Sequence, residues 1–492
     1  MTGSTAARGT ITRADGAPGA ASTVWARGNT LTGMDSTLAC LAAWMPRQRW
    51  CTAKGRAPHL RYVASWDMPV DEPGVRVRTL LVADEGTLPT AVYQLPIVAR
   101  ATSTVPEALT AHVIGTPDPG TTLIDAPHDP AYAAALLTLV TAGGTARGPR
   151  TTAVGHPVTP TSSVAAAGPA RGSVVTGEQS NTSIVFRFDD ATSPIICKVF
   201  RQVQPGRNPD IELNTALSAA RSPHVPRAVG WIDGEWPDPA TAAGTVRGSF
   251  AFAQEFFPDV EDAWRVALRS AAHDEDFRRS AYDLGTATAD VHLSLAHLFP
   301  SAPATGADRA NLRDVWQRRL ATAIAEVPQL GAAKHAIEAI YDRALESDWP
   351  PLQRIHGDYH LGQVILVPHR GWVLLDFEGE PMRSMSERTL PDLALRDVAG
   401  MLRSFDYVAG SIRLDHPDRS TSVRDWARNA RDSFLTGYGE RVGARATTVG
   451  PLLDALELDK AVYEATYEAR SRPTWIAIPL RAIERLVAAP AI

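Results

Sequence analysis

Residues 354–381 read RIHGDYHLGQVILVPHRGWVLLDFEGEP and combine a polar HGD turn with an acidic residue that closes an apolar run. Asp358 lies in the turn, Gln363 follows it, and Asp376 ends the strand-like segment. Phosphoryl transfer to a hydroxyl requires a carboxylate beside the acceptor oxygen and oxygen ligands for Mg²⁺ on the nucleotide phosphates. We therefore predict Asp358 as the catalytic base, and Gln363 and Asp376 as the Mg²⁺ ligands.

The same stretch has other interpretations. An aspartate in a loop is often only a turn former, and His356 and His360 are a possible metal pair. A carboxylate, an amide and a second carboxylate form a hard oxygen set, which suits Mg²⁺ better than Zn²⁺. The combined spacing favours the phosphoryl-transfer interpretation.

A nucleotide-binding lobe also requires a lysine on an inner strand and an acidic partner for it. The segment PIICKVFR places Lys198 among apolar residues, where an unpaired ammonium would be costly. Glu212 in the following amphipathic segment is the predicted partner. The turn GEQSNTSIVFRF is predicted to cover the phosphates through Ser180, Asn181 and Thr182, although it has few glycines and also fits an ordinary hairpin.

The segment AFAQEFF has the pattern of a strand that ends in a connection between two lobes. We predict that residues 254–257 present backbone groups to the adenine ring, with Glu255 and Phe257 as nucleotide contacts. A plain core strand is the alternative.

Composition excludes several classes of protein. The chain has 492 residues, a net charge of −5 and three cysteines, so a nucleic-acid binder and a disulfide-stabilised miniprotein are both disfavoured. The N-terminal residues lack the apolar segment of a signal peptide, and the apolar run AYAAALLTLV is too short to span a membrane. We expect a cytoplasmic protein that has neither a membrane nor a nucleic acid as partner.

The order of segments predicts an α+β fold with a β-rich lobe before a helical lobe. We expect a disordered tail over residues 1–28, a small α+β cap domain over 29–140 and a linker over 141–172. The linker is predicted from its high content of Gly, Pro and Thr. The nucleotide-binding lobe is expected over 173–258 and the helical lobe over 259–492.

The motifs together resemble the aminoglycoside-phosphotransferase and choline-kinase-like branch of the eukaryotic-type kinases, and within that branch the bacterial maltokinases. The matching stretches are RQRW, GEQSNTSIVF, NPDIELNTAL, HGDYHLGQVIL, LLDFEGEP, LRDVAGMLRSFDY and KAVYEATYEARSRPTW. They extend from about Leu38 to the C-terminus. The resemblance implies a bilobal kinase fold with an N-terminal cap, and an ATP-dependent transfer to the anomeric hydroxyl of maltose that gives maltose 1-phosphate.

By the same resemblance, Asp358 takes the position of the base, Gln363 and Asp376 the Mg²⁺ positions, and Lys198 that of the phosphate-binding lysine with Glu212 as its partner. Residues 177–183 take the position of the phosphate-covering loop. The metal-binding amide is Gln363, where the wider kinase branch has Asn. The product would feed α-glucan synthesis from trehalose, and an association with trehalose synthase is expected.

A sugar site needs aromatic faces and polar groups, and the last long helical pattern supplies both. Tyr463 and Tyr467 share one helical face, charged residues share an adjacent one, and Trp475 follows. A solvated face beside a buried tyrosine stripe is an equally simple interpretation. Guided by the resemblance, we predict sugar contacts from Lys460, Tyr463, Glu464, Tyr467 and Trp475.

Asp397 has a different predicted role. It lies in an otherwise apolar helical segment, and we expect it to brace the catalytic loop through hydrogen bonds to the loop backbone.

Three other functions remain open. The first is a kinase for another acceptor, such as glucosamine or an aminoglycoside. The second is a non-catalytic nucleotide-binding scaffold, which the intact set of Lys198, Asp358, Gln363 and Asp376 disfavours. The third is a metal hydrolase built on His356, Asp358 and His360, which leaves Lys198 and Asp376 unexplained.

Overall fold

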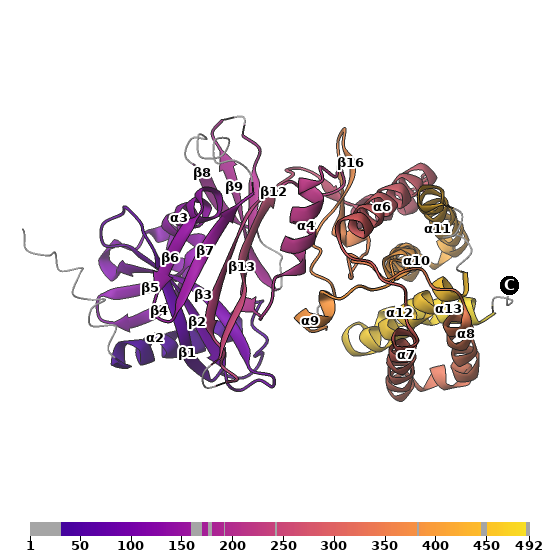
Figure 1. The fold of residues 1–492 in the computed structure, drawn as a ribbon, viewed down its shortest axis with the longest axis horizontal. Helices are drawn as coiled ribbons and strands as arrows, with labels where there is room; N and C mark the ends of the chain where they lie inside the picture. Colours follow the sequence, from indigo (N-terminus) through magenta and orange to yellow (C-terminus); the bar gives the residue numbers. More distant parts are fainter. Residues whose placement is uncertain are drawn as a thin grey trace, which may run out of the picture.

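The structure is a computed structural model that describes residues 31–158, 170–175, 180–190, 192–241, 244–380, 383–443 and 450–488. Two sheets occupy one end of the molecule and a group of helices the other (Figure 1). The predicted tail, residues 1–28, lies outside the described residues, as do residues 177–179 of the predicted phosphate loop.

The first sheet forms the cap, with the strand order β1-β2-β3-β5-β4. Its first strand has the bounds of the segment LRYVASWDM, as the β-branched and aromatic content predicts. Helix α3 begins where Asp129 accepts a hydrogen bond from the Ala131 amide, with Pro130 in the first turn. The elements are α2 (Leu31–Trp44), β1 (Leu60–Met68), β2 (Arg76–Asp84), β3 (Ala91–Ala101), β4 (Val113–Asp118), β5 (Thr121–Asp125) and α3 (Pro130–Ala142).

The second sheet is antiparallel and has the strand order β6-β7-β12-β13-β10-β9-β8. A short strand, β11 (Gln202–Val203), leaves this lobe and pairs with β3 of the cap. The strands are β6 (Gly144–Gly148), β7 (Thr151–Pro157), β8 (Ala170–Val174), β9 (Asn181–Phe188), β10 (Ile195–Phe200), β12 (Ala228–Pro237) and β13 (Thr245–Glu255).

The predicted linker over residues 141–172 is wrong for most of its described part, because β6 and β7 belong to the second sheet. Its glycines serve close packing. A Cβ on Gly155 would lie 1.9 Å from the Leu139 carbonyl oxygen, and one on Gly148 would lie 2.1 Å from the Ser65 carbonyl oxygen. Glycine in a strand often marks such a close backbone approach, so the composition that resembles a flexible linker is here a packing requirement.

The cap and the second sheet share one hydrophobic core. Trp66 of β1 packs on Phe250 of β13, with ring centroids 4.5 Å apart, inside a single cluster of buried residues from both sheets. The buried Arg201 guanidinium joins them further: it donates to the Asp125 carboxylate at 2.8 Å and to the Thr182 hydroxyl at 2.8 Å. The cap and the lobe of the second sheet therefore form one packed unit.

His128 at this junction predicts that the free energy of unfolding falls in acid. His128 stacks on His112 with ring centroids 3.5 Å apart, and burial lowers the pKa of His128 to about 4, although Asp125 opposes the shift. The pKa of a histidine in an unfolded chain is about 6.5. Between about pH 6.5 and 4 the unfolded chain therefore binds a proton that the folded chain does not, and the free energy of unfolding falls as the pH falls through this interval. Lowering the pH from 7 to 4.5 should cost about 2 kcal/mol through His128.

The measurement is the free energy of urea unfolding at the two pH values, for the native chain and for His128→Gln. The variant should lose about 2 kcal/mol less on acidification. Equal losses in the two proteins would show that His128 does not titrate in this way.

The helical lobe contains most of the remaining chain and a small sheet of order β14-β15-β16. Helices α6 and α11 pack closely, since a Cβ on Gly285 would lie 2.1 Å from the Phe434 carbonyl oxygen. The elements are β14 (Glu261–Asp262), α5 (Ala263–Ala272), α6 (Arg278–Leu298), α7 (Gly306–Glu326), α8 (Lys334–Glu346), β15 (Val364–Val367), β16 (Gly371–Leu374), α9 (Met385–Arg388), α10 (Leu395–Asp415), α11 (Ser420–Val442), α12 (Gly450–Ser471) and α13 (Ala477–Ala488). Among the described helices, we find none whose length and apolar content would suit a membrane span.

Helix α4 (Pro209–Ala219) lies between the sheets and the helical lobe (Figure 1). Its N-cap is Asn208, whose side chain accepts from the Asp210 amide, and Pro209 fixes the first turn. Ile211 packs toward the second sheet, whereas Leu213 and Leu217 belong to the core of the helical lobe. The helix is thus wedged between the two lobes, and its first turn faces the cleft between them.

Candidate active site

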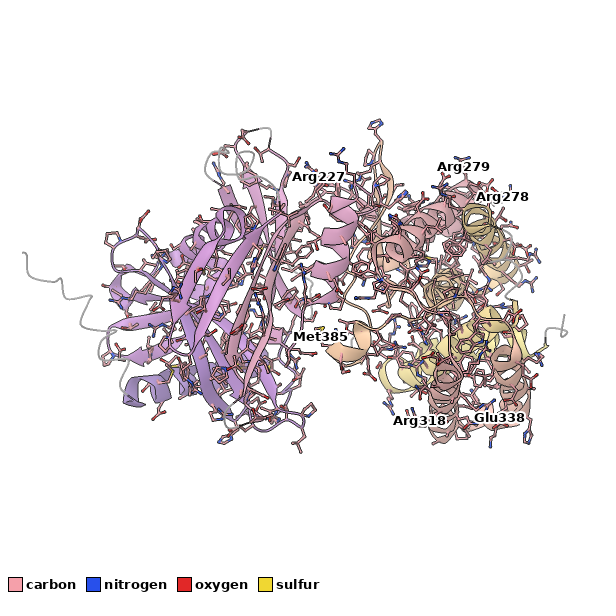
Figure 2. All side chains as sticks on the ribbon, in the orientation of Figure 1. Arg227, Arg278, Arg279, Arg318, Glu338 and Met385 are labelled. Carbon is pink, nitrogen blue, oxygen red and sulfur yellow. The ribbon has the colours of Figure 1, made fainter. Side chains whose placement is uncertain are left out.

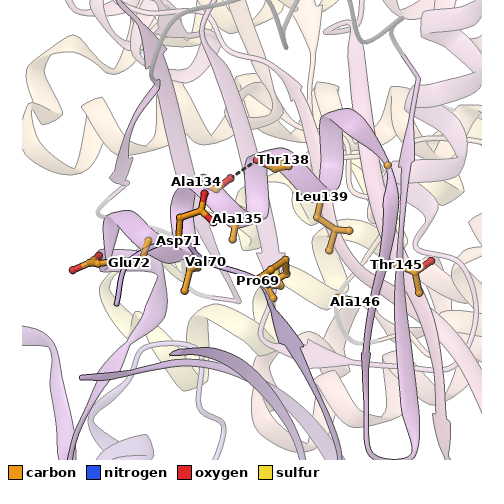
Figure 3. Close-up of a pocket in the computed structure, with 13 residues that line it drawn as sticks. Pro69, Val70, Asp71, Glu72, Ala134, Ala135, Thr138, Leu139, Thr145 and Ala146 are labelled. Carbon is orange, nitrogen blue, oxygen red and sulfur yellow. Dashed lines mark hydrogen bonds between the residues drawn. The ribbon is translucent and has the colours of Figure 1, made fainter. Parts of the chain in front are cut away.

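Two cavities of similar size differ in their chemistry. One of about 550 Å³ lies in the cap beneath α3, and its lining is mainly alanine and other apolar side chains (Figure 3). Its lining includes two carboxylates, Asp71 and Glu72, and Glu72 is already bound by Arg100. The other, of about 520 Å³, lies between the second sheet and the helical lobe and has the titratable side chains Lys198, Glu255, Asp259, Asp262 and Asp376 in its lining. The second cavity is the candidate site.

The ammonium of Lys198 forms the centre of this cleft. Its Nζ lies 2.9 Å from Asp210 Oδ2 and 2.7 Å from Asp376 Oδ1. Burial opposes the charge, but the carboxylates of Asp210, Asp376 and Glu378 outweigh it and hold the pKa of Lys198 well above its ordinary value. The inner strand and the acidic strand end therefore converge, as the sequence analysis requires.

The predicted partner of this lysine is wrong. Asp210 rather than Glu212 pairs with Lys198, and Glu212 forms an ion pair with Arg354 of the helical lobe. Asp210 is fully buried, and its Oδ1 also accepts from the Phe377 amide at 3.0 Å. The reason is helical phase: because α4 begins at Pro209, Asp210 faces β10 and Glu212 faces the helical lobe.

The donor set around Asp376 fits a divalent cation. The carboxylates of Asp210, Asp376 and Glu378 offer oxygens within 4.8 Å of one another, and the Gln363 amide hydrogen-bonds Asp376. Burial and the neighbouring Asp376 raise the pKa of Glu378 to about 7, which indicates a carboxylate whose negative charge lacks full compensation. These are hard oxygen ligands of the kind that Mg²⁺ prefers. Glu378 was missed in the sequence because it reads as an ordinary polar residue in a turn.

The HGD turn is held from behind by Asp397. Its two carboxylate oxygens accept from the His356 amide at 2.8 Å and from the Gly357 amide at 2.9 Å, and His292 Nε2 lies 3.0 Å away. The predicted bracing role of Asp397 is confirmed. This network fixes the backbone that carries Asp358, whose side chain is partly exposed.

The histidines of the turn serve its geometry. His356 Nε2 lies 2.8 Å from the Leu375 carbonyl oxygen and its Nδ1 accepts from the Asp358 amide, so both ring nitrogens are engaged. His360 Nδ1 accepts from the Gly362 amide. These contacts disfavour the metal-hydrolase interpretation, since the His356 ring has no nitrogen left to bind a cation.

Two glycines bring the HGD turn of Asp358 against the turn that follows Asp376. A Cβ on Gly357 would lie 3.1 Å from the Gly379 Cα, and both glycines have positive φ, 85° and 74°. Asp376 itself has a φ of 66°, an uncommon conformation for a residue with a side chain. The two turns that carry Asp358 and Asp376 are therefore in backbone contact.

The predicted nucleotide contacts divide into two groups. Ser180, Asn181, Glu255 and Phe257 line the cleft. Thr182 does not: its hydroxyl faces the opposite side of β9 and accepts from Arg201, because successive strand residues point to opposite faces. The prediction for Thr182 is wrong.

The predicted sugar contacts also divide. Lys460 Nζ lies 4.0 Å from Asp358 Oδ1, and the cationic groups of Lys460 and Arg319 lie 5.6 Å and 5.4 Å from the centroid of the Tyr463 ring. Glu464 is wrong as a sugar contact, because it is buried and bound by Arg403 at 2.9 Å.

Tyr467 and Trp475 lie further along the same face. Tyr467 is 48% exposed, and Arg472 lies over both Tyr467 and Trp475. The structure shows no contact between either aromatic ring and Asp358, so their sugar role stays a prediction. Arg319 on α7 is a further residue next to Tyr463, and the sequence analysis missed it. It pairs with Asp459 at 2.6 Å and carries no motif that would reveal it.

Comparison with known proteins places this geometry in a family. Residues 44–129 match the maltokinase N-terminal cap domain, and residues 172–444, more than half of the chain, match the phosphotransferase enzyme family. The chain belongs to the phosphotransferase enzyme family. The predicted order of a maltokinase-type cap before a kinase-like domain is confirmed, as is the α+β bilobal fold.

This phosphotransferase also has similar relatives of known sequence and structure. It is 29% identical over 319 residues to the glucosamine kinase of Streptacidiphilus jiangxiensis, and the alignment covers 63% of this chain and 71% of that relative. It is 29% identical over 328 residues to the glucosamine kinase of Mycolicibacterium smegmatis, and this alignment covers 64% of this chain and 79% of the relative. A solved structure described as glucosamine kinase in complex with glucosamine, ADP and inorganic phosphate matches the fold with a TM-score of 0.63 and 23% identity, over 91% of this chain and 98% of that one.

Proposed function

We propose that this phosphotransferase is a sugar kinase that uses ATP to phosphorylate maltose at the anomeric hydroxyl, giving maltose 1-phosphate. The observation that carries the proposal is the convergence of Lys198 and Asp376 in one cleft, with Asp358 on an adjoining turn. The maltokinase-type cap and the phosphotransferase domain support a sugar kinase, and maltose is the acceptor that the resemblance of the sequence motifs implies. The proposal has three further parts. The product feeds α-glucan synthesis, the enzyme associates with trehalose synthase, and its location is cytoplasmic.

Each side chain has a distinct part in the transfer. Lys198 donates to phosphate oxygens of the nucleotide, while the buried Asp210 keeps the lysine charged and oriented. Asp358 accepts a hydrogen bond from the sugar hydroxyl, orients its oxygen toward the γ-phosphorus and takes its proton. Gln363, Asp376 and Glu378 would hold Mg²⁺, which when bound neutralises charge on the phosphates.

The side chains around Asp358 suit an acceptor that carries several hydroxyl groups. Lys460 lies 4.0 Å from the predicted base, and the cationic groups of Lys460 and Arg319 lie 5.6 Å and 5.4 Å from the centroid of the Tyr463 ring. Sugar hydroxyls accept hydrogen bonds from lysine and arginine, and they donate to carboxylates such as Asp358. A tyrosine ring offers an apolar face for a pyranose ring.

Glucosamine is the second candidate acceptor. Both curated relatives at 29% identity are glucosamine kinases, and the solved structure with the same fold is one as well. Glu380 is one carboxylate near Lys460. Burial opposes its charge, but Lys460, Arg319 and Arg383 outweigh burial and hold the pKa of Glu380 low, so an ammonium group would compete with these cations for it.

The test is an acceptor panel with ATP and Mg²⁺. Initial rates are measured with maltose, glucose, glucosamine and an aminoglycoside, and the product is examined by phosphorus and proton NMR. We expect kcat/KM for maltose to exceed that for glucosamine by at least about 100-fold, with the phosphate on the anomeric carbon. If kcat/KM is higher for glucosamine than for maltose, glucosamine replaces maltose as the proposed acceptor. If no sugar in the panel is phosphorylated, the proposed function is wrong.

A further inference from the structure

The hairpin of β15 and β16 belongs to the helical lobe and forms part of the wall of the cleft. Ile365 of β15 lines the candidate site. Val367 pairs with Gly371, so residues 368–370 form the turn of the hairpin. The last residue of this turn, Arg370, makes the contacts that join the hairpin to the second sheet.

The guanidinium of Arg370 binds three acceptors outside the hairpin. Its Nε donates to the Pro223 carbonyl oxygen at 2.7 Å, and its Nη2 donates to the Val225 carbonyl oxygen. Its Nη1 donates to the Glu255 carboxylate at 2.9 Å. Pro223 and Val225 precede β12, and Glu255 ends β13. One side chain therefore ties the hairpin of the helical lobe to two segments of the second sheet.

The same arginine contacts the segment in which we predict the adenine contacts. Glu255 and Phe257 line the cleft, and the Arg370 guanidinium lies over the Phe257 ring, 5.1 Å from its centroid. Burial opposes the charge of Glu255, but hydrogen bonds from Arg370 and Arg227 outweigh burial and lower the pKa of Glu255. Arg370 therefore holds two side chains of the cleft from the side of the hairpin turn.

A second arginine near Glu255 is placed less favourably. Arg227 lies at the boundary between the sheets and the helical lobe (Figure 2). Its Nη2 lies 3.4 Å from the Glu255 carboxylate, and its side chain is 66% exposed, against 23% for Arg370. Because exposed ion pairs contribute little, Arg227 is a matched control for Arg370.

We propose that Arg370 is a positioning residue that, through Glu255 and Phe257, fixes the nucleobase side of the cleft. This proposal rests on the proposed kinase function. A planar guanidinium donates to two carbonyl oxygens and a carboxylate at once, so it holds three segments in one geometry. Without Arg370 the nucleobase side of the cleft loosens, whereas Lys198 on the phosphate side keeps both of its carboxylate partners.

The experiment separates the two ends of the nucleotide by calorimetric titration. Kd is measured for adenosine, for ADP and for tripolyphosphate, with Mg²⁺ and without sugar, in the native chain, Arg370→Met and Arg227→Met. In Arg370→Met we expect Kd for adenosine and for ADP to rise about tenfold, because charge-assisted hydrogen bonds are lost. Kd for tripolyphosphate and kcat at saturating ATP should stay within about twofold of native. Arg227→Met should stay within about twofold for every ligand.

A second variant tests whether Arg370 acts through Glu255. Glu255→Gln should raise Kd for adenosine by at least about threefold, because the charge of the acceptor is lost. This variant gives the same test if Arg370→Met does not fold. In the double variant, the rise in Kd should be smaller than the product of the two single effects, as expected of residues in contact.

Three results would overturn the proposal. The first is a Kd for adenosine within about twofold of native in Arg370→Met, and the second is an equal rise in Kd for tripolyphosphate. The third is a double variant whose Kd equals the product of the two single effects. If the native chain does not bind ADP, the proposed kinase function is wrong. A failure of maltose as the acceptor contradicts the proposed substrate alone, because the titrations contain no sugar.

Discussion

Replacing Asp358 by asparagine is expected to lower kcat by about 1,000-fold, because the amide keeps the shape of the carboxylate but does not take the acceptor proton. The turn should keep its backbone, since Asp397 binds the amides of His356 and Gly357, and neither bond involves the Asp358 carboxylate. ATP affinity should therefore change by less than about threefold, because Lys198 and Asp376 are untouched. The measurements are steady-state kinetics with the preferred sugar, calorimetric titration of ATP and thermal unfolding.

Asp425→Asn is the matched control for this change. It removes one aspartate charge at an exposed position where the carboxylate pairs with Arg428 at 2.9 Å. Native turnover is expected in this variant. Turnover of Asp358→Asn within about tenfold of native would remove Asp358 from the role of base.

The second large effect concerns Asp210. In Asp210→Asn, Lys198 loses its buried anionic partner and keeps only the partly exposed Asp376, so the free energy of unfolding should fall by about 3 kcal/mol. Kd for ATP should rise by at least about tenfold, because the lysine is drawn toward Asp376 and the Phe377 amide loses its charged acceptor. Urea unfolding and calorimetric titration of ATP measure the two effects.

Glu212→Gln is the control that separates the two acidic residues of α4. Glu212 pairs with Arg354 and its side chain is 30% exposed, so the amide should leave Kd for ATP within about threefold of native. The opposite pattern, with a larger loss of ATP affinity in Glu212→Gln than in Asp210→Asn, would restore Glu212 as the partner of the lysine.

The sequence predicted the elements with a strong period or composition. The bounds of β1 match LRYVASWDM, and the last long helix lies where the apolar pattern of residues 451–470 indicates. The bracing role of Asp397 was also predictable, because a carboxylate flanked by apolar residues on a buried helix face requires hydrogen-bond donors. Local signals of this kind do not depend on how distant segments pack.

The errors have a common physical cause: each depends on which way a side chain faces in the folded chain. Asp210 and Glu212 lie two residues apart on one helix, and only the start at Pro209 decides which of them faces Lys198. Glu464 shares a helical face with Lys460, but α12 is packed on several sides, and Arg403 of α10 captures the glutamate. Composition alone likewise could not distinguish the packed glycines of β6 and β7 from those of a linker.

The most direct test of the account is a structure of the chain with a non-hydrolysable ATP analogue, Mg²⁺ and maltose. The account predicts phosphate oxygens within hydrogen-bonding distance of Lys198 Nζ, and the anomeric oxygen of maltose between Asp358 and the γ-phosphorus. Nucleotide bound away from Lys198 and Asp376, or sugar bound away from Asp358, would contradict it.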